Sequence, residues 1–193
     1  MEYNNSVNKV RIIEYWRGYL AFRQKVIIKP AGPRPMAKDI KKFGSVEEVL
    51  DFAISREVEA YDFYMKLAKL AKKPEIIKII RDLAIDEKQH KIRLEAAKAG
   101  EVALGAQEVG RLGIANYVED VKPTQDMSYV ELLAIAMKKE DRSYRLYTDL
   151  AAIAQKKELK EMFLKLAQEE AEHKLQFEFQ YDLATFQKRD KKR

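Results

Sequence analysis

The chain contains no cysteine among its 193 residues. This absence excludes disulfides, zinc fingers built on cysteine, thiol catalysis and cysteine-ligated iron centres within the chain. There is also no run of 18 or more apolar residues, so we expect no membrane-spanning helix. The N-terminus has no apolar stretch after its first basic residues, so we expect no secretory signal and a cytoplasmic location.

An excess of positive charge is absent from most of the chain. The net charge is +6, and residues 1–35 contribute +5 of it, with seven Lys or Arg against two Asp or Glu. A second basic segment is the tail at 188–193. Because the body between them is nearly neutral, we expect no nucleic-acid partner and no membrane partner.

The basic arm, residues 1–38, matches nothing else in the sequence. Four aromatic residues lie among its basic residues and could contact nucleic acid or a membrane: Tyr15, Trp16, Tyr19 and Phe22. We favour two simpler interpretations, a disordered arm or a gene start placed too far upstream. In the second case Met36 is the true initiator.

The rest of the sequence repeats itself at an offset of 83 residues. Residues 45–91 align with residues 128–174 without a gap and share 17 identities in 47 positions. Chance at this composition would give roughly four. The repeat indicates two copies of one supersecondary unit.

Each copy has the pattern of two helices. Ser45 and Ser128 are good N-caps, and a glutamate three residues after each completes a capping box. Apolar residues then recur at helical spacing, and no segment within 45–187 has a β-strand pattern. Pro74 suits the first turn of a second helix, which a C-capping Gly100 would end. The predicted helices cover about 46–72, 74–99, 129–154 and 157–187.

The connections predict the topology. The links near 72–74 and 155–157 are short enough only for antiparallel hairpins, whereas residues 101–127 can cross the length of a helix. We therefore predict an all-α fold, a ferritin-like four-helix bundle made of two helix-hairpin repeats joined by a long crossover. Its domain would span 39–187, between the basic arm and the basic tail.

The chain has only two histidines, and each lies three residues after a glutamate, on the same helix face. One further acid lies among apolar residues on the first helix of each repeat, where an unpaired carboxylate would be costly to bury. A single Glu-x-x-His would mean little, but two copies in register predict a site for two metal ions. Iron or manganese suits these ligands, which discriminate poorly against zinc or cobalt. The predicted ligands, which would also be the catalytic residues, are Glu57, Glu87, His90, Glu140, Glu170 and His173.

Four other residues are candidates for positioning these ligands. Asp86 and Glu169 each precede a ligand glutamate, and either could accept a hydrogen bond from the second nitrogen of a ligating histidine. Tyr64 and Tyr147 lie seven residues after the first-helix acids, on the same face, and could hydrogen-bond ligand carboxylates. Surface acids and ordinary core packing are the alternative interpretations for these two pairs. Glu59 lies roughly 200° around the helix from Glu57, so we expect it at the surface.

These motifs resemble the rubrerythrin family of the ferritin-like superfamily over about residues 40–187. The resemblance is carried by Glu57 with Tyr61 and Tyr64, Glu87-Lys88-Gln89-His90, Glu140 with Tyr144 and Tyr147, Glu170-Ala171-Glu172-His173, and the segment Lys122 to Tyr129. It implies a non-haem di-iron centre that reduces hydrogen peroxide in oxidative-stress defence. It also implies a rubredoxin-like electron donor and a homodimer, in which helix pairs could be exchanged between subunits.

Two departures from that family weaken the functional part of the expectation. Ser143 stands where rubrerythrins usually carry a further glutamate, and no four-cysteine rubredoxin domain is present, so electrons would come from a separate protein. The alternatives are a ferroxidase or iron-storage protein using oxygen, a manganese catalase or oxygenase on the same ligands, and a bundle that lost its metal and binds a partner.

Overall fold

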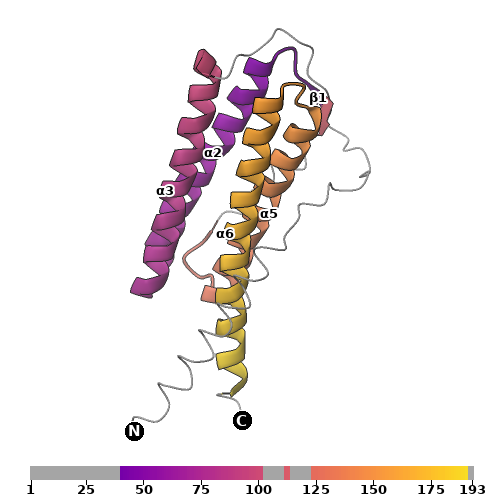
Figure 1. The fold of residues 1–193 in the computed structure, drawn as a ribbon. Coiled ribbons are helices and arrows are strands. Elements are labelled where there is room, and N and C mark those ends of the chain that lie inside the picture. The colour runs from indigo at the N-terminus through magenta and orange to yellow at the C-terminus, as the bar shows by residue number, and fades with distance from the viewer. Residues whose placement is uncertain (1–39, 102–110, 114–122, 191–193) are drawn as a thin grey trace. The chain divides into compact units, whose positions relative to one another are not determined.

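The structure, a computed structural model, describes residues 40–101, 111–113 and 123–190. The basic arm predicted for 1–38 and the end of the tail, 191–193, lie outside these residues. Four long helices make up most of the described chain and form two antiparallel pairs (Figure 1). They are α2 (Val46–Leu70), α3 (Pro74–Ala96), α5 (Tyr129–Ile153) and α6 (Lys157–Asp190). No helix among these residues is long and apolar enough to cross a membrane.

Local sequence explains where these helices begin and end. Helix α2 ends at Leu70 rather than at 72, because Ala71 is already extended, with φ −67° and ψ 140°. Pro74 likewise restricts Lys73 to an extended conformation, with φ −93° and ψ 125°. Helix α3 widens into a π-helical turn, Ala97–Glu101, which contains Gly100 at φ +97°. That left-handed conformation favours glycine. Helix α6 continues past 187 to Asp190, because no glycine or proline stops it there.

The two N-caps differ in one detail from the prediction. Ser128 and Glu131 form the expected reciprocal capping box at α5. Ser45 also accepts a hydrogen bond from the Glu48 amide, but the Glu48 carboxylate accepts from the Gly44 amide instead of from Ser45. The first repeat therefore has a serine cap without the full box.

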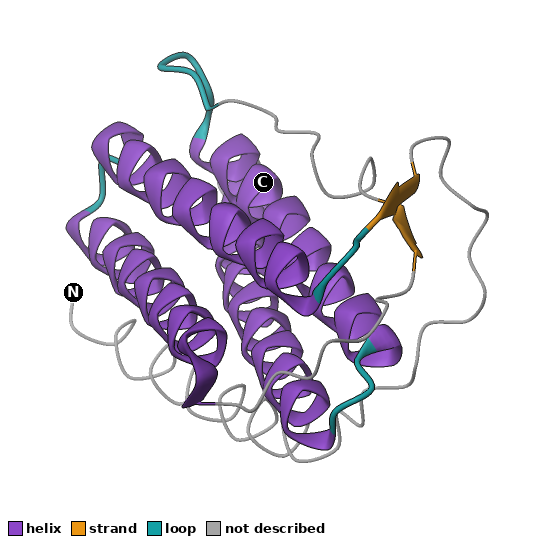
Figure 2. Cartoon of the chain, turned by 90° about the horizontal axis from the view of Figure 1, so that it is seen from above, coloured by secondary structure: helices purple, strands orange, loops and turns teal. Residues whose placement is uncertain are grey.

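The prediction that no strand occurs within 45–187 is wrong at one point. A short strand in the crossover, β2 (Arg111–Gly113), pairs antiparallel with β1 (Ile40–Lys42), with Lys41 opposite Leu112. Figure 2 shows this pair of strands beside the helices. A ladder of three residues is too short to produce an alternating sequence pattern, so periodicity does not reveal it.

The buried core follows the internal repeat of the sequence. Residues 83 positions apart are buried in both hairpins, among them Leu50 and Leu133, Tyr64 and Tyr147, Leu67 and Leu150, and Leu83 and Leu166. One apolar cluster combines residues of all four helices, including Leu83 of α3, Leu133 of α5 and Phe177 of α6. The all-α bundle of two hairpins joined by a long crossover is therefore confirmed, and both hairpins build one core.

Candidate metal centre

Six ionisable side chains lie buried between the four helices. Each of these residues, backbone included, is 8% exposed or less, which is rare for glutamate and demands compensating partners. Helices α2 and α5 each contribute one glutamate, and α3 and α6 each contribute a Glu-x-x-His pair. The residues are Glu57, Glu87, His90, Glu140, Glu170 and His173.

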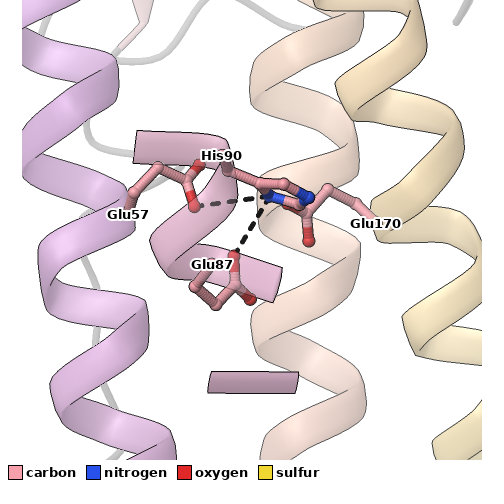
Figure 3. Close-up of side chains that lie close together, drawn as sticks. All are labelled: Glu57, Glu87, His90 and Glu170. Carbon is pink, nitrogen blue, oxygen red and sulfur yellow. Dashed lines mark ion pairs between the residues drawn. The ribbon is translucent and has the colours of Figure 1, made fainter. Parts of the chain in front are cut away.

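The six side chains form two overlapping groups. In the first, Glu57, Glu87, His90 and Glu170 offer ligand atoms that all lie within 4.8 Å of one another, and Figure 3 shows these side chains converging. In the second, Glu140 and His173 join Glu87 and Glu170 within the same distance. Because Glu87 and Glu170 belong to both groups, they are placed to bridge two ions. The structure thus brings together all six residues that were predicted as ligands.

Both histidines turn the same nitrogen toward the cluster. His90 Nδ1 lies 2.9 Å from Glu170, 3.3 Å from Glu87 and 3.5 Å from Glu57. His173 Nδ1 lies 3.6 Å from Glu140 and 3.8 Å from Glu170. The two rings are nearly parallel, 12° apart, with centroids separated by 5.8 Å. A metal ion in either group would therefore meet Nδ1.

The other imidazole nitrogens contact acids of the opposite hairpin. His90 Nε2, on α3, lies 3.0 Å from Glu169 of α6, and His173 Nε2, on α6, lies 3.4 Å from Asp86 of α3. These are the two acids named as candidates from the sequence, but the sequence did not indicate which histidine each would meet. Such contacts fix the tautomer and the ring orientation of a ligating histidine.

The two candidate tyrosines behave differently, although both are fully buried. The Tyr147 hydroxyl donates a hydrogen bond to Glu57 Oε1, across the bundle from α5 to α2. The Tyr64 hydroxyl has no hydrogen-bond partner among the described residues, and its ring stacks on Phe177 with centroids 5.9 Å apart. Of these two tyrosines, Tyr147 alone hydrogen-bonds a cluster carboxylate in the described part of the chain.

The polar atoms of the cluster fit metal ions. Within the described part of the chain, several of them are buried without a hydrogen bond of good geometry, although the nitrogen–oxygen distances are 2.9–3.8 Å. They are Glu57 Oε2, Glu87 Oε2, both oxygens of Glu140 and Glu170, and Nδ1 of His90 and His173. Buried acceptors without donors are costly, and cations remove that cost. The residues present therefore suit a dimetal centre.

Without metal, protons occupy part of the cluster. Burial, followed by the neighbouring carboxylates, raises the pKa of Glu57 and Glu140 well above the ordinary value. Burial opposes charge on His90 and His173, but adjacent carboxylates outweigh it and raise the pKa of both imidazoles. Burial likewise raises the pKa of Glu170, but both histidines outweigh it and hold the pKa well below its usual range. Metal binding would have to displace these protons.

Arg93 completes the cluster on one side, and the sequence analysis missed it. Its guanidinium makes a two-pronged hydrogen bond to Glu169, the acid that also meets His90. Burial raises the pKa of Glu169, but the hydrogen bonds from His90 and Arg93 outweigh it and lower that pKa to about 2. Its position in the sequence could have indicated this role, because Arg93 lies one helical turn after His90 on α3.

Glu59 lies at the surface as expected and pairs with Arg56.

Comparisons with known proteins agree with this architecture. No curated protein matches the chain. A hypothetical protein from Pyrococcus furiosus is 26% identical, with a TM-score of 0.55 over 72% of this chain and 89% of that one. A Thermotoga maritima protein described as a ferritin-like diiron-carboxylate protein is 23% identical, with a TM-score of 0.56 over 72% of this chain and 95% of that one.

The strongest comparison is with a family model. The model described as Rubrerythrin matches residues 48–181, a range that includes α3 and α5 whole, most of α2 and α6, and the six cluster residues. With the fold and the buried carboxylate–histidine cluster in place, the chain belongs to the rubrerythrin family.

Proposed function

We propose that the protein is a non-haem di-iron oxidoreductase that reduces hydrogen peroxide to water with electrons from a separate rubredoxin-like protein. The observation that carries this proposal is the buried set of four glutamates and two histidines, whose inward atoms lack hydrogen-bond partners among the described residues. Family membership supports peroxide as the substrate. The reaction consumes two electrons and two protons per peroxide and yields two waters.

The residues have distinct roles in this proposal. Glu87 and Glu170 would bridge the ions, because each belongs to both ligand groups. Glu57 with His90 and Glu140 with His173 would complete the two positions through carboxylate oxygens and Nδ1. Bound iron would supply the two electrons and act as a Lewis acid toward the O–O bond. Manganese or mixed metals could occupy the same ligands.

The surrounding residues keep these ligands in place. Tyr147 holds one oxygen of Glu57, leaving Oε2 directed toward the cluster. Glu169 and Asp86 accept from the outer nitrogens of the histidines, so that Nδ1 is the nitrogen left for metal. Tyr147 is fully buried where it meets Glu57, so its ring keeps water from that carboxylate.

A ferroxidase that uses oxygen is the second candidate. Ser143, half-buried on α5, stands where other members of the family usually carry a further glutamate, so a ligand exchange that depends on that glutamate is not available here. A plain ferroxidase does not need it. A homodimer remains part of the proposal for either function.

The test combines metal content with rapid kinetics. The full-length protein is loaded with Fe(II) without oxygen, its iron is counted, and its oxidation by peroxide and by oxygen is followed in parallel by stopped flow. Two irons per chain with peroxide as the faster oxidant would support the peroxide reductase. Two irons with oxygen as the faster oxidant, or uptake of many irons, would favour the ferroxidase or storage role.

A matched pair of variants links the result to the cluster. Glu170→Gln should lose both irons, since Glu170 is shared by the two ligand groups. Glu178→Gln makes the same change two turns further along α6, at an acid that is 43% exposed and pairs with Lys174, and should keep both irons. Full iron content in Glu170→Gln would contradict the assigned site.

A further inference from the structure

We infer that the two metal positions are unequal: the position at His90 and Glu57 binds its ion more tightly and fills first, and the position at His173 and Glu140 is the exchangeable one. This inference rests on the proposed function, because it concerns the same cluster. The two positions come from the two copies of the repeat, so every residue around one has a counterpart 83 positions away around the other. Differences between counterparts therefore reveal differences between the positions.

The first difference is in the contacts of the outer acids. Glu169 is held on both sides, by His90 Nε2 at 3.0 Å and by the two prongs of Arg93. Its counterpart Asp86 lies farther from its histidine, 3.4 Å, and its side chain is 53% exposed. Within the described residues Asp86 has no cationic partner besides His173. The residue that corresponds to Arg93 in the second repeat is Gln176.

The second difference is in the carboxylates of the first helices. Glu57 has one oxygen fixed by the Tyr147 hydroxyl. Its counterpart Glu140 has neither oxygen hydrogen-bonded within the described chain, and Tyr64, the counterpart of Tyr147, donates to no described residue. One carboxylate is therefore positioned before metal binds, whereas the other must be ordered by the metal.

The third difference is the exposure of the two histidine side chains to solvent. The His90 side chain is 1% exposed and the His173 side chain is 11% exposed. All three differences favour tighter metal binding at the His90 position than at the His173 position. Ligands that are already oriented lose less conformational freedom on binding, which increases affinity. A more exposed histidine with a weakly held outer acid favours entry and exit of the ion at its own position.

Arg93 and Tyr147 are the positioning residues in this inference, and the repeat supplies reciprocal substitutions to test them. Arg93→Gln gives the His90 position the residue found at the His173 position, and Gln176→Arg does the reverse. Each is made in a background that keeps only one position. His173→Gln leaves the His90 position, and His90→Gln leaves the His173 position. The full-length metal-free proteins are titrated with Co(II), and binding is followed by its visible absorbance.

The expected results are specific to one position. In the His173→Gln background, Arg93→Gln should weaken Co(II) binding by about 10- to 100-fold, the usual effect of losing an outer contact to a ligand. Tyr147→Phe should weaken the same position, because it releases Glu57. In the His90→Gln background, Arg93→Gln should change nothing, and Gln176→Arg should tighten binding. Lys78→Gln, which breaks an exposed ion pair elsewhere on α3, is the control and should affect neither position.

Three outcomes separate the hypotheses. Two Co(II) ions of unequal affinity, with the tighter one lost in His90→Gln and weakened by Arg93→Gln, would support the inference. Two ions of equal affinity, or equal effects of Arg93→Gln and Tyr147→Phe on both positions, would overturn the inference and leave the dimetal centre intact. If the unsubstituted protein bound no Co(II) at the histidines, both the inference and the proposed function would fail.

Discussion

The bundle buries two kinds of layer, and they contribute to stability in opposite directions. One is apolar, with residues such as Leu83, Leu133 and Phe177 from different helices packed in one cluster. The other is charged, with four glutamates and two histidines buried among the same helices. Burying apolar surface stabilises the fold, whereas burying carboxylates without partners destabilises it. The apolar layer therefore maintains the bundle, whereas the charged layer lowers the stability of the metal-free protein and is suited to metal ions.

The largest effect on the free energy of unfolding is expected from substitutions in the apolar layer. Leu83→Ala should lower the free energy of unfolding by about 2–5 kcal/mol, because it removes a buried side chain and leaves a cavity. Leu166→Ala, at the corresponding place in the second repeat, should have an effect of similar size. Urea unfolding of the metal-free proteins measures both. A loss below about 1 kcal/mol at both positions would show that the apolar layer is less important for stability than its burial indicates.

Apolar substitution in the charged layer should instead raise the free energy of unfolding of the metal-free protein. Glu140 is fully buried, and neither of its oxygens is hydrogen-bonded within the described chain. Glu140→Met combined with His173→Leu replaces both members of a buried pair with apolar side chains and should stabilise the metal-free protein by about 1–4 kcal/mol, as the replacement of a whole buried ion pair often does. The same variant should lose metal from the His173 position. Thermal unfolding without metal tests the first result and metal analysis the second. Destabilisation of the metal-free variant would remove the contrast between the layers.

The charged layer should also make metal binding depend on pH. The pKa values of His90, His173, Glu57 and Glu140 are raised in the metal-free protein, so these groups hold protons that metal must displace. Affinity should therefore rise as pH rises, by about 1.4 kcal/mol per pH unit for each proton released. Titration calorimetry in two buffers with different ionisation enthalpies counts these protons. Binding without proton release would show that the metal-free cluster is already deprotonated.

The smallest effect is expected at the surface, outside both layers. Lys78 and Asp82 form an ion pair one turn apart on α3, with side chains that are 77% and 54% exposed. Lys78→Ala should change the free energy of unfolding by at most about 0.5 kcal/mol, because solvent screens such pairs. A larger change in urea unfolding would mean that the outer face of α3 takes part in packing.

The sequence predicts the convergence of these six side chains for a physical reason. Helical spacing puts residues three apart on one face, so Glu87 and His90, like Glu170 and His173, must project together wherever their helices lie. The internal repeat then supplies the second half of the set in the same register. Serine caps and Pro74 are likewise local features, and the starts of α2, α3 and α5 follow from them.

What the sequence did not predict depends on how the two hairpins face each other. Asp86 lies four residues before His90 on its own helix, yet it meets His173 on the opposite hairpin. The pair formed by Arg93 and Glu169 joins residues 76 positions apart, and the hydrogen bond from Tyr147 to Glu57 joins residues 90 positions apart. No local pattern encodes these contacts. The same holds for the ladder between β1 and β2, which joins two segments of three residues.

The repeat also bears on how such a protein could arise. One hairpin, with Glu57, Glu87 and His90, supplies half of the cluster, so two identical hairpins related by a two-fold axis would supply all of it. In that ancestral arrangement every substitution would appear on both sides at once. Duplication and fusion of the gene place the halves in one chain and let each mutate alone. Arg93 in one half and Gln176 at the corresponding place in the other are a difference of this kind.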